Sequence, residues 1–160
     1  MSDDSVKIDC EDEPEWLTIA KAEIGQSEII GSNDNPRIIE YLKSCVFPPW
    51  TEFHDEISWC SAFINWDMKR AGYLGTDSPA ARSWLHYGKI LDAPRLGCIT
   101  ILSRGMVWQG HVGLWLKSSK TSVTLLSGNT SNKVCIQDFP ISHVLGYRWP
   151  VTGDKNAGSI

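Results

Sequence analysis

The spacing of apolar residues divides the chain into a helical first half and a second half rich in short strands. Apolar side chains recur three and four positions apart over residues 15–24, 36–45, 60–71 and 79–87, which predicts four helices. Glycines at 25, 72 and 88 end the first, third and fourth of these helices. Asn35 and Pro36 are typical of a cap and a first-turn proline, and Ser58 is the expected N-cap of the third helix.

After Pro94 the pattern changes to short runs of β-forming residues separated by glycine, serine and asparagine. These runs predict strands over residues 98–102, 111–116, 122–127, 133–137 and 145–149. Helices followed by strands are typical of an α+β fold, with the helices packed on one antiparallel sheet of about five strands. We expect one domain over residues 15–150, preceded by an acidic arm over 1–14 and followed by a tail over 151–160.

Composition excludes several classes of function. The chain has 160 residues, of which 42% are hydrophobic, and its net charge of −4 without a basic cluster argues against nucleic-acid binding. The five cysteines are odd in number and form no CxxC pair, so they predict neither a disulfide framework nor a zinc site. We expect no cofactor and no metal, because phosphate-binding glycine loops and HExxH-type spacings are missing from the sequence.

The N-terminal residues have no basic segment followed by an apolar run, and no stretch is apolar enough for a membrane span. We therefore expect a protein made in a cytosol without a signal peptide, where its thiols stay reduced. Action on a target outside the cytoplasm would then need another means of delivery.

Cys60 is the principal candidate for chemistry. It falls in the first turn of the predicted helix over 60–71, where the partial positive charge of the helix N-terminus stabilises a thiolate. Such a position is expected to lower the thiol pKa from about 8.5 toward neutrality. The alternative is that Cys60 is a small buried apolar residue without reactivity.

A nucleophilic cysteine needs a base, and the sequence offers four histidines. His111 begins a predicted strand between Gly110 and Gly113, where it could face the start of the neighbouring helix. The alternative for His111 is a hydrogen-bonded core imidazole. His54 is a minor candidate, whereas His86 and His143 are expected at the surface or in a turn; these four are the only histidines of the sequence.

A polar residue that orients the histidine is expected on the next strand. If the strand over 122–127 pairs antiparallel with the His111 strand, its end lies beside His111, and either Ser127 or Asn129 could hold the ring. Asn129 also fits a turn, because it belongs to a Gly-Asn-Thr-Ser-Asn segment. Eight tryptophans permit a groove for sugars or peptides, and we consider Trp59, Trp84 and Trp108 for it.

These motifs together resemble a known group of enzymes. The segments are Trp59-Cys60-Ser61-Ala62-Phe63, Gly110-His111-Val112-Gly113 and Ser127-Gly128-Asn129, with Asn35-Pro36-Arg37-Ile38, Ala81-Arg82-Ser83-Trp84 and Leu145-Gly146-Tyr147-Arg148-Trp149-Pro150 around them. In this order they resemble the NlpC-type and CHAP papain-like cell-wall hydrolases, and more closely a small bacterial and phage family within that group. The likeness covers about residues 15–150.

The resemblance implies a papain-like α+β fold and hydrolysis of an amide bond in peptidoglycan, with the stem peptide as the partner that is bound. The bond is either the N-acetylmuramoyl–alanine amide or one within the stem peptide. It implies Cys60 as nucleophile, His111 as general base and Asn129 as the polar third member. The backbone N–H of Cys60 or Ser61 would stabilise the oxyanion. The chain departs from its relatives in having Trp59 where many NlpC-type enzymes have aspartate, and Ser127 where CHAP enzymes commonly have glutamate.

Two other activities are compatible with the same residues: a non-catalytic wall-binding module, and an acyltransferase that passes the acyl group to an amine or thiol. A wall hydrolase without a signal peptide would act either as a phage lysin or as an effector delivered by a type VI-like secretion system. The second route would imply a dedicated immunity protein as a partner. The sequence leaves open which bond is cut and how many copies of the chain associate.

Overall fold

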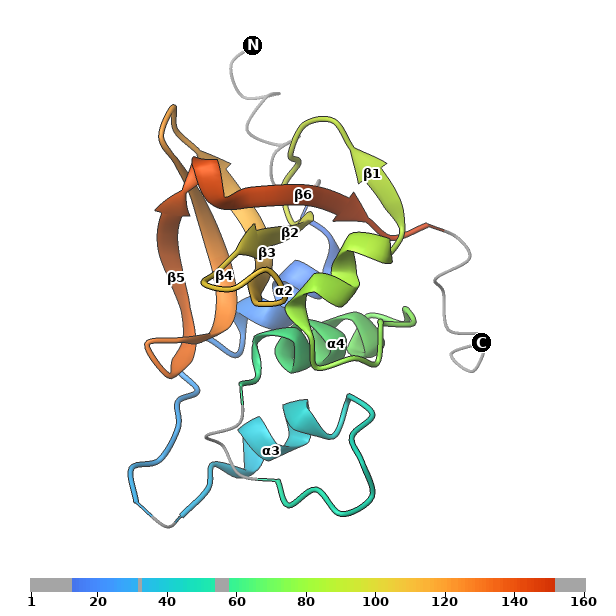
Figure 1. Cartoon of the computed structure of the whole chain (residues 1–160), viewed down its shortest axis with the longest axis vertical. Coiled ribbons are helices and arrows are strands. Elements are labelled where there is room, and N and C mark those ends of the chain that lie inside the picture. Colours follow the sequence, from blue (N-terminus) through green and yellow to red (C-terminus); the bar gives the residue numbers. More distant parts are fainter. Residues whose placement is uncertain (1–12, 32, 54–57, 152–160) are drawn as a thin grey trace.

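The computed structural model describes residues 13–31, 33–53 and 58–151 and has the predicted α+β architecture (Figure 1). Its helices are α2 (Glu15–Lys21), α3 (Pro36–Leu42), α4 (Cys60–Arg70) and the short 3₁₀ helices η1 (Ala81–His86) and η2 (Ile141–His143). Its strands are β1 (Lys89–Leu91), β2 (Ile99–Ser103), β3 (Gly110–Ser118), β4 (Ser122–Thr130), β5 (Lys133–Pro140) and β6 (Val144–Trp149). They form one open antiparallel sheet in the order β1-β6-β2-β3-β4-β5.

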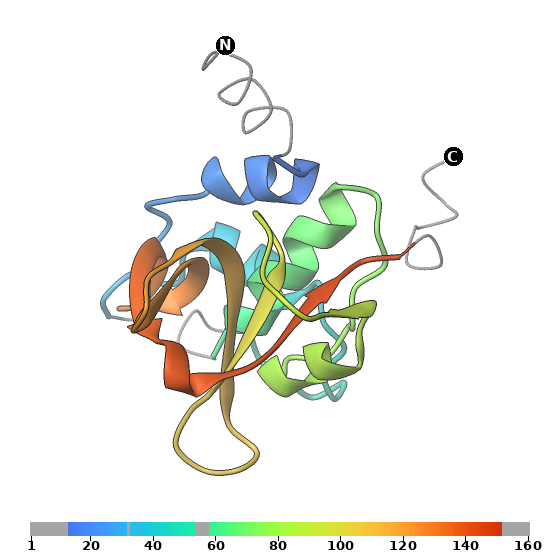
Figure 2. The same ribbon diagram turned by 90° about the horizontal axis from the view of Figure 1, so that it is seen from above.

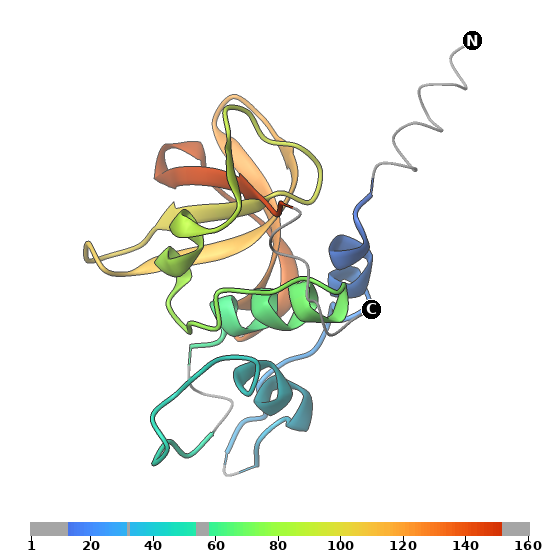
Figure 3. The same ribbon diagram turned by 90° about the vertical axis from the view of Figure 1, so that its right-hand side faces the viewer.

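Helix α4 is the centre of the molecule. It packs against β3 and β4 on one side and against α2 and α3 on the other, so that it lies between the sheet and α3 (Figures 1 and 3). Every residue from Cys60 to Met68 is buried, including the polar Asn65 and Asp67. The apolar spacing predicted one buried face, but a helix covered by elements on several sides buries all of its faces.

Local signals account for most element boundaries. The Asn35 side chain accepts a hydrogen bond from the Arg37 N–H (2.9 Å), and Pro36 begins α3, as predicted. Gly72 follows α4 with φ +87°, a conformation that glycine adopts without strain. The prediction of Ser58 as N-cap of α4 is wrong, because Trp59 occupies that position and no side chain caps the helix.

Several elements differ from the predicted ones, and each boundary of a predicted strand lies within a few residues of its predicted position. Helix α2 ends at Lys21 and α3 at Leu42, before the predicted ends at 24 and 45, because turns follow both helices. The predicted helix over 79–87 is a shorter 3₁₀ helix. Strand β1 was not predicted: its three residues form the sheet edge beside β6, and exposed Lys89 and Ile90 break the alternation of buried and exposed residues.

The sheet meets the start of α4 very closely at Gly128 in β4. A Cβ atom at this position would lie 2.6 Å from the Trp59 ring and 2.9 Å from Cβ of Phe63. Glycine is therefore required here by space, and it brings the end of β4 against the first turn of α4. Among the described residues, no helix is long and apolar enough to cross a bilayer. Most of the predicted arm and tail lies outside the described ranges.

Candidate active site

Cys60 is the first residue of α4, and its side chain is turned toward the sheet. The residue is 3% exposed, and the backbone N–H groups of Val112, Ser61 and Cys60 itself interact with the thiol and act to lower its pKa. Burial acts in the opposite direction and is the largest cause, so the pKa of the Cys60 thiol is raised. The pKa prediction from helix position alone is therefore wrong, because loss of water outweighs the stabilisation by the helix N-terminus.

His111 lies on β3, directly before the residue whose N–H reaches the Cys60 sulfur. It is 4% exposed, and Nε2 lies 2.9 Å from Oγ of Ser127 and 3.3 Å from Oγ1 of Thr130. Nδ1 is buried and has no hydrogen-bond partner among the described residues. We therefore assign the proton to Nε2, which donates to the hydroxyls and leaves the lone pair on Nδ1.

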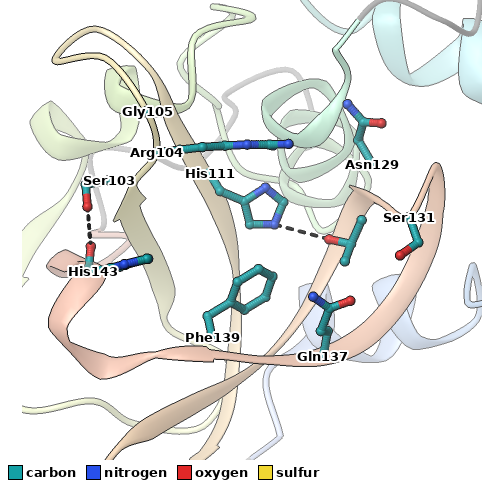
Figure 4. A pocket seen from close by; sticks show the side chains of 10 residues that line it. Ser103, Arg104, Gly105, His111, Asn129, Ser131, Gln137, Phe139 and His143 are labelled. Atoms are coloured by element: carbon teal, nitrogen blue, oxygen red, sulfur yellow. Dashed lines mark hydrogen bonds between the residues drawn. The ribbon is translucent and has the colours of Figure 1, made fainter.

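The imidazole is held on several sides. Figure 4 shows its ring between the Arg104 side chain and Phe139, whose ring centroid is 5.1 Å away at an interplanar angle of 34°. Burial, and secondarily the charge of Arg104, lower the pKa of His111 to about 4. The substrate-free site therefore combines a neutral thiol with a neutral imidazole at neutral pH, and not a thiolate–imidazolium pair.

Ser127 is the residue that contacts the imidazole from β4. It is fully buried and also lies 2.9 Å from Oγ1 of Thr130, so the two hydroxyls and Nε2 form a closed group. Gly113 makes room for this arrangement, because a Cβ atom there would lie 2.9 Å from Cβ of Ser127. Of the two residues considered for orienting the ring, Ser127 therefore has the hydrogen bond to it.

Asn129 is placed differently. The pairing of β4 with β5 is irregular between Ser127 and Thr130, and Asn129 has φ +57° within this bulge. Its Nδ2 donates to Oγ of Ser58 (3.4 Å), and in Figure 4 its side chain does not point toward the imidazole. The bulge thus directs Asn129 into the groove described below and away from His111.

Three further predicted residues, Trp59, Ser61 and Trp84, are buried and form hydrogen bonds that join neighbouring segments. The Ser61 hydroxyl donates to the Ser78 carbonyl (2.7 Å) and accepts from Trp84 Nε1 (2.9 Å), which ties α4 to the segment before η1. Trp59 donates through Nε1 to Glu28 (3.0 Å). Both tryptophans have no exposed surface, so the prediction that Trp59 and Trp84 line a substrate groove is wrong.

Trp108 is 67% exposed and lies beside a polar groove of about 720 Å³. The groove runs past the start of α4, past η1 and past the ends of β3 and β4, and is lined by Glu28, Ser58, Ala81, Arg104, Trp108, Gly110 and Asn129, among others. A second hollow of about 320 Å³ lies on the other side of Arg104, with His111, Thr130, Gln137, Phe139 and His143 in its wall. Arg104 and Asn129 line both hollows.

His86 and His143 are not in the group around Cys60. His86 is exposed on η1, and exposed His143 reaches only the second hollow. His54 lies outside the described residues. In the described ranges, no group of three or more histidine, cysteine or acidic side chains could hold a metal ion.

Sequence reasoning missed Thr130, Phe139 and Arg104. Arg104 directly follows Ser103, which pairs with Gly110 across the β2–β3 hairpin, so a hairpin reading of these strands would have placed it near His111. Thr130 carries no such signal, because it lies at the bulge in β4, which determines what it faces. Phe139 lies on β5 in the regular part of its pairing with β4, and its place beside His111 depends on the packing of the sheet. Comparison of the sequence with protein-family models and with curated proteins gave no match.

Proposed function

We propose that this chain is a cysteine hydrolase that cleaves an amide bond in the stem peptide of peptidoglycan. The observation that carries the proposal is the environment of His111. One ring nitrogen lies within hydrogen-bond distance of two hydroxyls, and the other has no hydrogen-bond partner among the described residues. The next residue of β3, Val112, contacts the Cys60 thiol through its N–H. A nucleophile, a base and an orienting group are the three parts of cysteine hydrolysis. The substrate class rests on the resemblance of the motifs to cell-wall hydrolases.

Because both groups are neutral, the first step is general-base catalysis. Nδ1 of His111 takes the proton from the Cys60 thiol as sulfur attacks the carbonyl carbon of the amide. The carbonyl becomes an oxyanion, which the backbone N–H groups of the first turn of α4 stabilise. Nε2 keeps its proton and donates it in a hydrogen bond to Oγ of Ser127, so the imidazolium has a hydrogen-bond acceptor at the moment its charge forms.

The imidazolium then donates its Nδ1 proton to the amide nitrogen, and the C–N bond breaks to release an amine and leave a thioester on Cys60. A water molecule gives a proton back to Nδ1 and attacks the thioester carbonyl. Collapse of this second oxyanion breaks the C–S bond and releases a carboxylic acid, and the proton on Nδ1 passes to the departing sulfur, which restores the thiol and the neutral imidazole. Phe139 packs beside the imidazole and limits its movement through these steps (Figure 4).

Digestion of purified sacculi tests the proposal. Wild type releases soluble fragments with new amino and carboxyl ends, whereas Cys60→Ala releases none. Cys98→Ala is the matched control, since it removes another buried thiol, which lies directly before β2 and four residues before Leu102, the partner of His111 in the sheet. Equal release by wild type and Cys60→Ala would refute the cysteine mechanism, and binding to sacculi without any product would favour a wall-binding module.

The pH dependence gives a separate test. A base with a pKa of about 4 is already neutral at weakly acid pH, so kcat/KM should rise with pH through about 4 and be level near pH 6. A thiolate–imidazolium pair would instead place the acid limb at the pKa of the thiol. The measurement is the initial rate of amine release from a soluble wall peptide between pH 3 and pH 8, values chosen to span the pKa of about 4.

A further inference from the structure

Arg104 differs from the other arginines of the chain in having no partner. Arg37 forms ion pairs, Arg82 and Arg148 donate to carbonyls, and Arg70 and Arg95 stack on tryptophan rings. Within the described residues, Arg104 has no ion pair, hydrogen bond or ring contact of this kind. It begins the loop between β2 and β3, which projects from the body of the molecule (Figure 2).

The Arg104 guanidinium lies close to the two residues proposed to carry out the reaction. The Arg104 side chain extends over the imidazole of His111 (Figure 4), and its charge acts on both Cys60 and His111. It also forms the wall shared by the polar groove and the second hollow. A group bound by Arg104 would therefore lie next to the atoms that react.

The second hollow is suited to an anion. Besides Arg104, its lining consists of hydrogen-bonding and apolar residues: Ser103, Gly105, His111, Asn129, Thr130, Ser131, Gln137, Phe139 and His143. No carboxylate is among them, although acidic residues exceed basic ones in the chain by 19 to 15. A guanidinium offers a planar fork of donors that matches a carboxylate, and such charge-assisted pairs are about twice as strong as neutral hydrogen bonds.

We propose that Arg104 recognises a free carboxylate of the substrate peptide and thereby selects which amide bond is presented to Cys60. This inference rests on the proposed function, because it names the feature of the wall peptide that the same site reads. The carboxylate could belong to a residue inside the peptide or to its C-terminus. Both have the same chemistry, so the experiment distinguishes them by amidating one at a time.

The test compares wild type, Arg104→Gln, Arg104→Lys and Lys120→Gln on three wall peptides: the free acid, the internal amide and the C-terminal amide. Lys120→Gln is the charge control, since it removes the same charge from the exposed β3–β4 turn at the other end of β3. We expect wild type and Lys120→Gln to prefer the free acid over one of the amides by about 10- to 100-fold in kcat/KM. Arg104→Gln should lose that preference, and Arg104→Lys should retain part of it.

The ratio of kcat/KM for the acid to kcat/KM for the amide shows whether Arg104 recognises the carboxylate or acts on the reaction through its charge alone. If Arg104→Gln slowed acid and amide substrates equally, Arg104 would act on the oxyanion or on His111, and carboxylate recognition would be overturned. The absence of any preference in wild type would overturn it as well. Circular dichroism and the Arg104→Lys variant show whether a loss comes from misfolding.

A binding measurement keeps this inference distinct from the hydrolase proposal. Titration calorimetry of Cys60→Ala and of Cys60→Ala combined with Arg104→Gln, with the same three peptides, requires no turnover. If wild type cleaves no peptide, the hydrolase proposal fails, while tighter binding of the acid that depends on Arg104 still supports the carboxylate site. If Cys60→Ala and the double variant bound the free acid with equal affinity, carboxylate recognition by Arg104 would be refuted whether or not wild type is active.

Discussion

Replacing Ser127 by alanine removes the shorter of the two hydrogen bonds that orient His111. The lost bond joins Ser127 Oγ to Nε2 over 2.9 Å, and the bond from Thr130 Oγ1 at 3.3 Å remains. The ring itself is 4% exposed, so water cannot readily replace the missing hydroxyl. The variant therefore tests whether Ser127 or Asn129 is the positioning residue.

The expected loss of kcat in Ser127→Ala follows from the hydrogen bonds of His111. Leaving a buried donor unsatisfied costs about 1–3 kcal/mol, which corresponds to about 5- to 150-fold in rate. Because Thr130 can still accept from Nε2, we expect Ser127→Ala to fall in the lower part of this range, about 5- to 20-fold in kcat. Combining Ser127→Ala with Thr130→Val removes both acceptors and should reach about 100-fold.

Asn129→Gly is the matched comparison, because glycine tolerates the φ of +57° without strain. It removes a side chain that bonds Ser58 and lines the groove, so we expect a change in KM of a few-fold and an almost unchanged kcat. The assay is steady-state cleavage of a soluble wall peptide, with nitrogen NMR of the imidazole to report its tautomer. A large loss of kcat in Asn129→Gly, with Ser127→Ala near wild type, would refute this assignment.

Three further predictions concern stability, each measured by chemical denaturation. The pKa of His111 is lowered from 6.5 to about 4, so the unfolded chain binds its proton first; about 3 kcal/mol of stability should be lost as pH falls from about 6.5 to about 4, and His111→Gln should lack this slope. Both carboxylate oxygens of Asp67 are buried without partners, and burial raises its pKa well above the usual value. Asp67→Asn should therefore stabilise the fold at pH 7 by about 1–3 kcal/mol and have less effect near pH 4, whereas destabilisation at pH 7 would contradict this. Gly128→Ala should destabilise by about 1–3 kcal/mol, since the new methyl group would meet Trp59 and Phe63, and unchanged stability would contradict the close contact.

The elements that the sequence predicted correctly are those governed by neighbours in the chain. The cap at Asn35, the position of Cys60 in the first turn of α4 and the glycine after α4 all depend on short-range hydrogen bonds and backbone preferences. Runs of β-forming residues between turn residues likewise indicated five of the six strands. The sixth, β1, is too short and too exposed to carry such a pattern.

The placement of site residues depended on contacts between distant segments. Trp59 and Trp84 read equally well as groove residues or core residues, and only the packing of α4 against β4 and η1 buries them. The pKa of the Cys60 thiol is raised and not lowered for a similar reason, since burial is a property of the whole fold and not of the position in the helix.

The sequence by itself determined that a cysteine begins a central helix, that a histidine begins a strand of an antiparallel sheet, and that Ser127 or Asn129 follows on the next strand. Only the tertiary structure decided between those two, because the bulge in β4 breaks the two-residue alternation of side chains after Ser127. Before the bulge, Ser127 faces His111; within it, Asn129 turns to Ser58. The hairpin between β2 and β3 likewise brings Arg104 over His111, a contact that local preferences do not encode.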